Sequence, residues 1–462
     1  MQTVDLVLKN GVVVTPSGRL EGGVAIDEGK IVLVGKEAHL PSADSIIDVK
    51  GRLILPGMID AHVHFRDPAK EGGDPQMEDF ASGTAAAAAG GITTVFDMPG
   101  SAPPVLSASV LEDKVRAIQN KAYVNFGLYG GAGIQNLEHF KELASAGVIA
   151  FKTFMITGSS YCATDDLSLL RVFEGVAATD LPCSVHAETG SVVDYLIGRL
   201  SAEGRRDPSA HPESRPNWVE AEAISKALIL SDAANARVHI AHMSTREGAH
   251  LVALAKAAGK RVTVETCPQY LLLTAEEMKR KGPYAKINPP LRSASDVRAL
   301  WEALRKGIVD VVASDHAPHT RGDKDVGFTD IWKAGPGMPG VETMLPLMLT
   351  KVNEGAISLE DLVRVMSESV SKVFDLYPRK GTVQVGSDAD LTIVDMKKEK
   401  TIKIGDLHTR ARNLVVYDGW KVKGAPIGTI VCGQLVMWEG EKVGKQGVGR
   451  FVTRIRGSMS AA

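Results

Sequence analysis

The stretch that decides the fold reads Arg52-Leu53-Ile54-Leu55-Pro56-Gly57-Met58-Ile59-Asp60-Ala61-His62-Val63-His64-Phe65-Arg66. In a β-strand successive side chains point to opposite faces, so His62, His64 and Arg66 share one face and the apolar residues between them share the other. Two imidazoles at this spacing can hold one metal ion from the same side. A pair of surface or core histidines would give the same pattern, so the choice depends on what the rest of the chain supplies.

The middle of the chain alternates apolar, β-branched runs with helix-like segments. Eight strands are expected, at Ile59–His64, Thr93–Met98, Tyr123–Leu128, Val148–Met155, Pro182–Ala187, Arg237–Met243, Val262–Pro268 and Asp310–Ser314. Helical patterns lie between them at Met77–Ala89, Ser107–Gln119, Asn217–Asp232, Thr245–Ala258 and Ser295–Lys306. Because parallel strands need long crossovers, this alternation predicts an α/β fold, a (β/α)8 TIM barrel.

A doubly wound sheet is the alternative fold. It usually carries a glycine fingerprint after an early strand, and the sequence has none there.

Both ends of the chain read as short strands. Residues 1–55 hold several, with Asn10-Gly11 as a hairpin signal, and similar runs return at Asp390–Asp395, Thr429–Cys432 and Leu435–Glu439. Because so few strands at either end make a poor core, we expect one small β-sandwich domain built from both termini. The expected boundaries are 1–55 and 381–440 for this domain, 56–380 for the barrel, and 441–462 for a tail that is either disordered or packed on a neighbour. Two polar connections, Thr189–Asn217 and His316–Gly340, are expected to be long loops at the substrate mouth.

Composition excludes several classes of function. The chain has 462 residues, 44% of them hydrophobic and 23% charged, with a net charge of −2. This is the balance of a globular enzyme, and there is no basic field to attract nucleic acid or a membrane surface. The start lacks the pattern of a signal peptide, and no apolar run is long enough to span a bilayer. The four cysteines are scattered without a C-x-x-C pair, so a disulfide scaffold is not expected and the cytoplasm is the default location.

Metal-ligand side chains follow the expected barrel strands, at the ends where catalytic groups of such barrels lie. They are His62, His64, Lys152, His186, His242 and Asp315. Taken singly, His186 and His242 could be hydrogen-bonded core histidines, and Asp315 could cap a helix that starts near Ala317. Their coincidence at five strand ends favours a metal site instead. Imidazole and carboxylate suit zinc, and the set is too large for one tetrahedral ion, so we expect two adjacent metal ions.

Lys152 lies in the apolar run Ala150-Phe151-Lys152-Thr153-Phe154-Met155. A lysine in such a setting can extend to the surface or pair with an acid. If it is buried without a partner, it tends to lose its proton. A neutral amine can add carbon dioxide to give a carbamate, whose two oxygens could bridge two metal ions.

Together these segments resemble one family, the cyclic amidohydrolases, which includes hydantoinases, dihydropyrimidinases, allantoinases and dihydroorotases. The resemblance runs from Pro56–His64 to Gly386–Leu391 and includes Phe151–Met155, Val185–Glu188, His239–His242 and Ser314–His319. It implies a binuclear zinc site in which His62, His64 and Asp315 hold one ion, His186 and His242 hold the other, and carbamylated Lys152 bridges them. It also implies that a bridging hydroxide attacks a ring amide, that Asp315 moves the proton, and that the chain forms a homotetramer or homodimer.

The motifs divide over which ring is opened. Val124–Gly131, Trp332–Gly335 and Glu342–Pro346 resemble the hydantoinase and allantoinase branch, whereas Phe65–Pro68 and Ile287–Arg292 resemble dihydroorotase. In dihydroorotase the arginine and asparagine of these motifs contact the substrate, so Arg66 and Asn288 are substrate-binding candidates, with His319 as a third. That family usually places a further asparagine after its Met-Pro pair, but here Met98-Pro99 precedes Gly100-Ser101. We therefore expect a hydantoin-like ring, with dihydroorotate as the alternative. A non-catalytic assembly protein related to dihydropyrimidinase is a remote alternative, because all six ligand positions are present.

Overall fold

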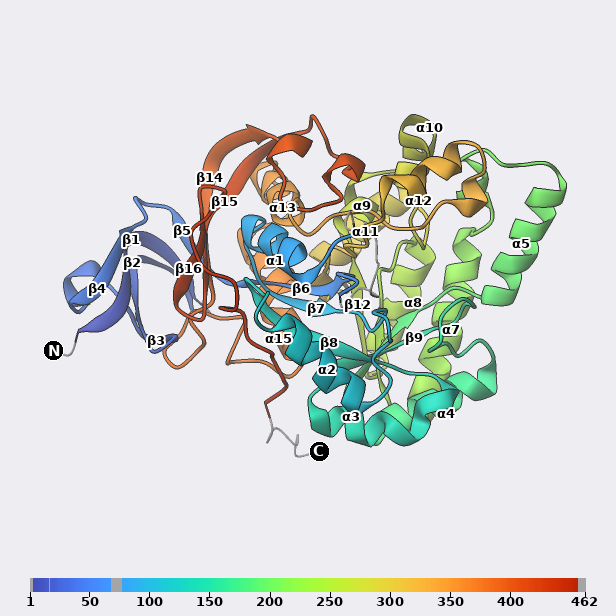
Figure 1. Ribbon diagram of the computed structural model, residues 1–462, viewed down its shortest axis with the longest axis horizontal. Helices are drawn as coiled ribbons and strands as arrows, with labels where there is room; N and C mark the ends of the chain where they lie inside the picture. The colour runs from blue at the N-terminus through green and yellow to red at the C-terminus, as the bar shows by residue number, and fades with distance from the viewer. Residues whose placement is uncertain (1–2, 16, 68–76, 456–462) are drawn as a thin grey trace.

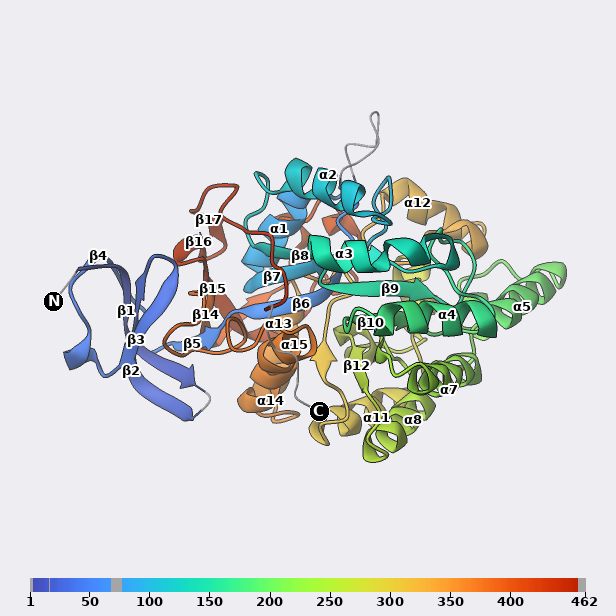
Figure 2. The ribbon, with the colours of Figure 1, turned by 90° about the horizontal axis from the view of Figure 1, so that it is seen from below.

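The computed structural model describes residues 3–15, 17–67 and 77–455. Two sheets dominate it. One is an eight-stranded parallel sheet surrounded by helices, and the other is a nine-stranded sheet to one side that contains strands from both ends of the chain (Figure 1). Figure 2 shows the same separation after a quarter turn, with the N-terminal strands farthest from the barrel.

The parallel sheet confirms the predicted barrel. Its strands pair in chain order, as β6 Met58–Val63, β7 Ile92–Asp97, β8 Asn125–Gly131, β9 Ala150–Phe154, β10 Pro182–His186, β11 Arg237–Ile240, β12 Val262–Thr266 and β13 Val311–Val312. The ring is nearly closed where Val63 forms a parallel bridge with His316 and the His64 amide donates to the His316 carbonyl at 2.8 Å. Each predicted barrel strand overlaps one of these eight, although β13 is only two residues long.

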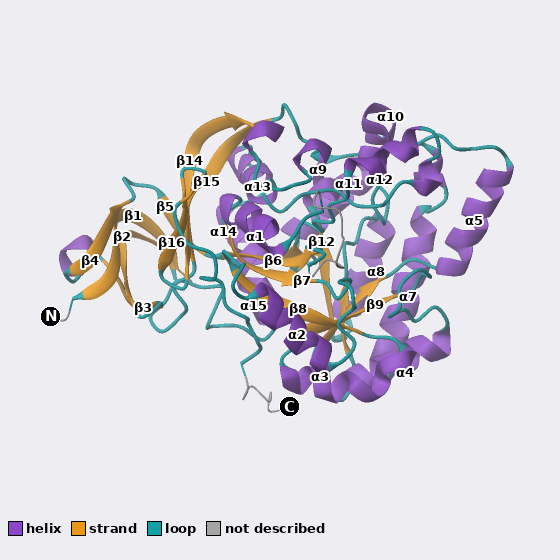
Figure 3. Ribbon diagram, in the orientation of Figure 1, coloured by secondary structure: helices purple, strands orange, loops and turns teal. Residues whose placement is uncertain are grey.

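Helices cover the outside of the barrel (Figure 3). The predicted ones are α1 Phe80–Ala89, α2 Ala108–Ile118, α7 Asn217–Ala233, α8 Arg246–Ala257 and α11 Ala294–Arg305. Further helices are α3 Phe140–Ala146, α4 Asp166–Ala177, α9 Pro268–Leu272, α10 Glu277–Lys281, α13 Met344–Asn353, and α14 Leu359–Val363 joined through a π-helical turn to α15 Ser369–Val373.

The expectation of two long loops at the mouth holds for residues 316–340, which are mostly irregular and reach the barrel mouth through Ala317, His319 and Pro336, but it is wrong for residues 189–217, which are mainly helical. Residues 189–217 contain α5 Gly190–Ala202 and α6 Ala210–Glu213, and residues 316–340 contain α12 Arg321–Asp325. Helix α5 buries Val193, Leu196 and Leu200, which recur at helical spacing. The glycines and β-branched residues around them disfavour helix locally, so packing of Val193 and Leu196 against Val219 of α7 stabilises the helix.

The second sheet confirms a small β-domain made by both termini. Its strands are β1 Val4–Thr15, β2 Gly18–Asp27, β3 Lys30–Gly35, β4 Ala43–Asp48, β5 Leu53–Pro56, β14 Leu391–Thr401, β15 Lys421–Val431, β16 Gln434–Trp438 and β17 Glu441–Lys442. Strand β5 joins the two halves because it pairs in parallel with β1 and antiparallel with β14. A shared core holds Leu8, Val24 and Ile54 from one terminus and Leu391 and Ile430 from the other.

The predicted hairpin at Asn10-Gly11 is wrong. Strand β1 runs through both residues and pairs with β2 along its length, with a register shift between Leu8 and Gly11. The shift lets the first part of β1 pair with β4 and the second part with β5. Asn10 adopts φ of 56°, so the turn-forming residue makes a bulge here.

The tail lies on the chain's own barrel. The amides of Gly447 and Gly449 donate to Ala122, and Phe126 of β8 exchanges backbone hydrogen bonds with Arg450 and Val452. Val452 joins a buried cluster at the barrel with Phe96, Tyr129 and Phe374. Neither disorder nor packing on another molecule is needed to explain residues 447–455, and residues 456–462 of the expected tail lie outside the described part.

No helix in the described part of the chain is both long enough and apolar enough to cross a membrane.

Candidate functional site

A cavity of about 530 Å³ opens at the carboxyl ends of the barrel strands. All nine residues singled out from the sequence line it, namely His62, His64, Arg66, Lys152, His186, His242, Asn288, Asp315 and His319. The four metal-candidate rings form a chain of contacts from His64 to His186, with neighbouring ring centroids 4.7–5.3 Å apart.

Three of these side chains form a group that could hold a metal ion. The Nε2 atoms of His62 and His64 lie 3.3 and 3.5 Å from one carboxylate oxygen of Asp315. Ligand atoms from all three residues lie within 4.8 Å of one another. Strand β6 carries His62 and leads directly into His64, and near-closure of the barrel brings Asp315 beside both imidazoles.

His186 and His242 face each other on the other side of the cavity. Nδ1 of His186 lies 3.0 Å from Nε2 of His242, and both side chains are buried. The second ring nitrogen of His186, Nε2, lies 2.7 Å from Glu188, which is paired in turn with Arg215. A carboxylate on one ring nitrogen fixes the orientation of the ring and leaves the other nitrogen free for a metal.

Glu265 has the same role for His62 and was missed in the sequence. This buried side chain at the end of β12 contacts Nδ1 of His62 and lies 3.2 Å from Nε2 of His239, and it accepts the backbone N–H of His242 at 3.1 Å. Holding Nδ1 of His62 leaves Nε2 facing Asp315. The signal that could have found Glu265 is a charged residue inside the predicted strand Val262–Pro268, and Glu188, two residues after His186, was a similar signal.

Lys152 is fully buried on β9, and its amine has no hydrogen-bond partner among the described residues. The Nζ atom lies 5.1 Å from the centre of the Phe154 ring. Burial lowers the pKa of Lys152 to about 8, against the pull of Glu265 and Asp315. An appreciable fraction of this amine is therefore neutral at physiological pH.

The electrostatics of the site favour neutral imidazoles at His64, His186 and His242 and an ionised carboxylate at Asp315. Burial lowers the pKa of His64 to about 4 and takes the pKa of His186 and His242 below the ordinary value. Burial alone would raise the pKa of Asp315, but the adjacent His62 and His64 hold it below the ordinary value. These are the protonation states that metal ligands need.

Three residues of the site adopt left-handed backbone conformations that are rare outside glycine. They are Arg66, His242 and Asp315, with φ of 54°, 34° and 48°. Such strain is characteristic of functional sites and needs the surrounding structure to hold it. For Asp315, Asp60 helps to do so by accepting the backbone N–H of Ser314 at 3.0 Å.

The substrate-binding candidates form the cavity wall. Among the described residues, Oδ1 of Asn288 and Nε of Arg66 are buried without a hydrogen-bond partner, and Arg66 forms no ion pair. His319 is held by the Pro336 carbonyl, 2.9 Å from Nε2. Asp67 contacts Lys121 at 2.9 Å, so it does not neutralise Arg66, whereas Pro68 of the same motif lies outside the described residues.

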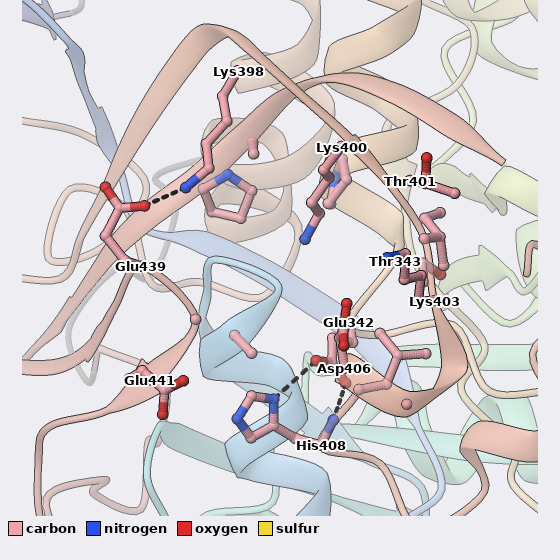
Figure 4. A pocket seen from close by; sticks show the side chains of 18 residues that line it. Glu342, Thr343, Lys398, Lys400, Thr401, Lys403, Asp406, His408, Glu439 and Glu441 are labelled. Atoms are coloured by element: carbon pink, nitrogen blue, oxygen red, sulfur yellow. Dashed lines mark hydrogen bonds and ion pairs between the residues drawn. The ribbon is translucent and has the colours of Figure 1, made fainter. Parts of the chain in front are cut away.

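A segment of the β-domain reaches the rim of the barrel. Between β14 and β15 the chain crosses over as residues 402–420, and two buried glutamates of the barrel fasten it. Glu342 accepts from the backbone N–H of His408 at 2.8 Å and lies 3.0 Å from its ring, as Figure 4 shows beside a second cavity. Glu78 accepts from the hydroxyl of Thr409 and lies 3.4 Å from His316, the neighbour of Asp315.

Comparisons with known proteins agree with this geometry. Residues 53–436 match the model of the Amidohydrolase family. The chain is 38% identical to an allantoinase from Rubrobacter xylanophilus over 98% of both chains, and 37% identical to a dihydroorotase from Methanothermobacter thermautotrophicus over 93% of both. The solved structure of an L-hydantoinase (dihydropyrimidinase) from Arthrobacter aurescens superposes with a TM-score of 0.92 at 37% identity, covering 98% of this chain and 100% of the other. The chain therefore belongs to the amidohydrolase family, and within it to the cyclic amidohydrolases, which hydrolyse cyclic amides.

Proposed function

We propose that this protein is a binuclear metal hydrolase that opens the cyclic amide bond of a hydantoin-like ring, as a hydantoinase or an allantoinase. The observation that carries the proposal is the convergence of four imidazoles, one carboxylate and one buried amine without a hydrogen-bond partner among the described residues on a single cavity at the barrel mouth. The similarity to L-hydantoinase and allantoinase over nearly the whole chain supports the choice of ring.

The donor set fits two divalent cations, for which we propose zinc. His62, His64 and Asp315 would hold one ion, and His186 and His242 would hold the other. Glu265 contacts Nδ1 of His62 and leaves Nε2 facing Asp315, and Glu188 lies on Nε2 of His186 and leaves Nδ1 facing His242. When bound, the two cations would supply Lewis acidity toward a ring carbonyl and would lower the pKa of a water molecule.

Lys152 would complete the site as a carbamate formed with carbon dioxide. The amine is fully buried, lacks a hydrogen-bond partner among the described residues and has a pKa of about 8, so it is reactive toward carbon dioxide. The carbamate would add two oxygen ligands from β9 to a site that otherwise has nitrogen ligands and one carboxylate.

Asp315 is the group that we assign to proton transfer. The carboxylate is ionised near neutral pH and lies at the cavity, so it can accept a proton as water adds to the ring carbonyl carbon. When the ring C–N bond breaks, the departing nitrogen takes that proton from Asp315, and the carbonyl carbon becomes a carboxylate. Because the ring is opened and not divided, the new carboxylate and the released nitrogen remain on one product molecule.

A second candidate is dihydroorotase, and one observation favours it. The Arg66 guanidinium lines the cavity and has no ion pair with the described part of the chain, so it could bind the carboxylate of a ring substituent.

A homotetramer or homodimer is proposed for the assembly. In support, large apolar side chains are exposed on neighbouring helices at the side of the barrel, as Leu167 on α4, Trp218 and Ile229 on α7, and Leu254 on α8. Light scattering coupled to size exclusion would measure the mass.

The deciding experiment is a substrate panel with metal-loaded protein, using hydantoin, 5-substituted hydantoins, allantoin, dihydrouracil and dihydroorotate. We expect close to two divalent ions per chain, loss of activity on chelation, and the highest kcat/KM with hydantoin or allantoin. Highest kcat/KM with dihydroorotate would select the alternative. Protein that purifies without stoichiometric metal and hydrolyses none of the rings would instead match a non-catalytic relative.

Asp315→Asn tests the proton route within this proposal. We expect kcat to fall by about 10²–10⁴-fold, the usual contribution of a general acid–base group. Metal content should be largely retained, because the amide oxygen can still act as a ligand. Asp44→Asn, an exposed change on β4, is the matched control. Unchanged kcat in Asp315→Asn would remove Asp315 from this role.

A further inference from the structure

Tyr161 fills a slot in the cavity wall that two glycines leave open. An added Cβ at Gly131, the last residue of β8, would lie 2.8 Å from Cγ of the tyrosine ring, and one at Gly100 would lie 3.3 Å from its hydroxyl. The ring also packs against Phe154, with centroids 5.6 Å apart. Tyr161 is 6% exposed, so its side chain has a fixed place between β8 and the loop after β7.

The hydroxyl of Tyr161 thus stands where a longer side chain at position 100 would reach. The next residue does not compete for this place, because the Ser101 hydroxyl donates to the Pro103 carbonyl at 3.0 Å. Both Gly100 and Tyr161 line the same cavity as Arg66. Where Gly100 follows Met98-Pro99 in place of an asparagine, the Tyr161 hydroxyl therefore brings a polar group to the same part of the cavity wall.

Arg66 and Tyr161 line the same cavity, and each side chain carries hydrogen-bond donors. The nearby carboxylate of Asp97 is taken by Lys114 at 2.6 Å, and Arg66 forms no ion pair with any of the described residues, although Asp323 and Asp315 act on it from farther away. Burial raises the pKa of Tyr161 to about 12, so the phenol is protonated and can donate. A charged donor and a neutral donor that share a cavity wall suit an acceptor group with two oxygens.

We propose that Arg66 and the Tyr161 hydroxyl together bind an oxygen-bearing substituent of the ring. This inference rests on the proposed function, since it assumes that the cavity takes a cyclic amide. A carboxylate suits the uncompensated guanidinium best, and the carbonyl of a ureido group offers the same acceptor with less charge. An alkyl substituent would leave the Arg66 guanidinium unpaired, which is costly for a buried charged group, and would offer no acceptor to the Tyr161 hydroxyl. Tyr161 is therefore a specificity-determining residue for oxygen-bearing substituents.

Tyr161→Phe removes one oxygen and is the test, with Tyr195→Phe on the exposed face of α5 as the matched control. In metal-loaded enzyme we expect kcat/KM to fall at least tenfold for dihydroorotate or allantoin, whichever is hydrolysed. For unsubstituted hydantoin or dihydrouracil the change should stay within twofold. Comparing the loss with dihydroorotate, which carries a carboxylate, and with allantoin, which carries a ureido group, shows which of the two substituents the subsite binds. Equal losses on substituted and unsubstituted rings, or no loss on either, would overturn the inference.

Binding measured without turnover keeps this test separate from the proposed function. Calorimetry should show that orotate binds the wild type and binds Tyr161→Phe at least fivefold more weakly. No binding of orotate to Arg66→Met should be detected. Uracil, which lacks the carboxylate, should bind all three proteins alike. If no ring is hydrolysed while orotate shows this dependence, the proposed function fails and the subsite stands. If rings are hydrolysed and orotate binds Tyr161→Phe as tightly as the wild type, the subsite alone fails.

Discussion

At the scale of single residues, the site depends on carboxylates that aim imidazoles as much as on the imidazoles themselves. Glu265 serves three hydrogen donors at once, from His62, His239 and the backbone of His242. A glutamine of the same shape offers one oxygen and an NH₂ group, so at least one histidine would face a donor instead of an acceptor.

We therefore expect Glu265→Gln to weaken metal binding by about 10–100-fold, the usual cost of losing such a partner. Metal content after dialysis against graded chelator measures this directly. Glu247→Gln, a more exposed change on α8, is the control. If Glu265→Gln keeps wild-type metal affinity, the orientation of His62 is set by something other than this carboxylate.

The same residues show what sequence can and cannot predict. The His-x-His pattern and the strand-end histidines follow from local periodicity. The sequence alone therefore places His62, His64, His186 and His242 together at the mouth of the barrel. A charged residue inside a strand marks Glu265 as unusual, but its partner lies 203 positions away, so the local pattern does not show that Glu265 holds His62. The slot for Tyr161 was equally hidden, because it depends on what two distant glycines lack.

At the scale of elements, strands were more predictable than their pairing. The barrel strands are apolar runs that the parallel sheet buries on both faces, so their existence and order follow from composition. Asn10-Gly11 has the local chemistry of a turn, but β1 continues through it because β2, β4 and β5 all pair with this strand. Helix α5 shows the reverse case. Its local helix propensity is poor, and the packing of its apolar face stabilises the helix.

The crossover at residues 402–420 illustrates an element whose role only the structure shows. Thr409 donates its hydroxyl to Glu78, which lies beside His316 at the active rim. Thr409→Val keeps the shape but leaves a buried carboxylate one donor short, so we expect the free energy of unfolding to fall by about 1–3 kcal/mol.

Urea unfolding followed by tryptophan fluorescence would measure this loss. Thr409→Ser keeps the hydroxyl and should stay closer to the wild type. If the valine and serine variants have the same stability, the contact with Glu78 contributes little, and the rim is held by Glu342 and Arg410 instead.

At the scale of the whole molecule, a buried cluster of charges joins the β-domain to the barrel. Asp390 accepts from Asn125 of β8 at 2.9 Å and from the backbone N–H of Cys432 at 2.8 Å, and it pairs with Lys380. Lys380 also lies 3.0 Å from Asp388, which contacts Lys30 of β3 at 2.6 Å. Segments from both termini and the barrel therefore depend on one network, and its charges give the molecule a pH-dependent stability.

Asp388 makes the acid side of that dependence testable. Although burial opposes it, Lys380 and Lys30 hold the pKa of Asp388 below its ordinary value. A group with a lowered folded pKa contributes stability above its unfolded pKa, about 3.9 for aspartate, and loses it as pH falls through the folded pKa. Asp388→Asn should therefore be less stable than the wild type near pH 7, and the difference should shrink toward about pH 3.

Urea midpoints of the two proteins across this range would test the prediction. The same carboxylates raise the pKa of Lys380 despite its burial, so the lysine stays charged throughout the acid window and does not blur the comparison. Asp44→Asn, on the exposed strand β4, controls for the loss of one negative charge. A stability difference that stays constant from pH 7 to about pH 3 would show that the Asp388 charge does not hold the two parts of the molecule together.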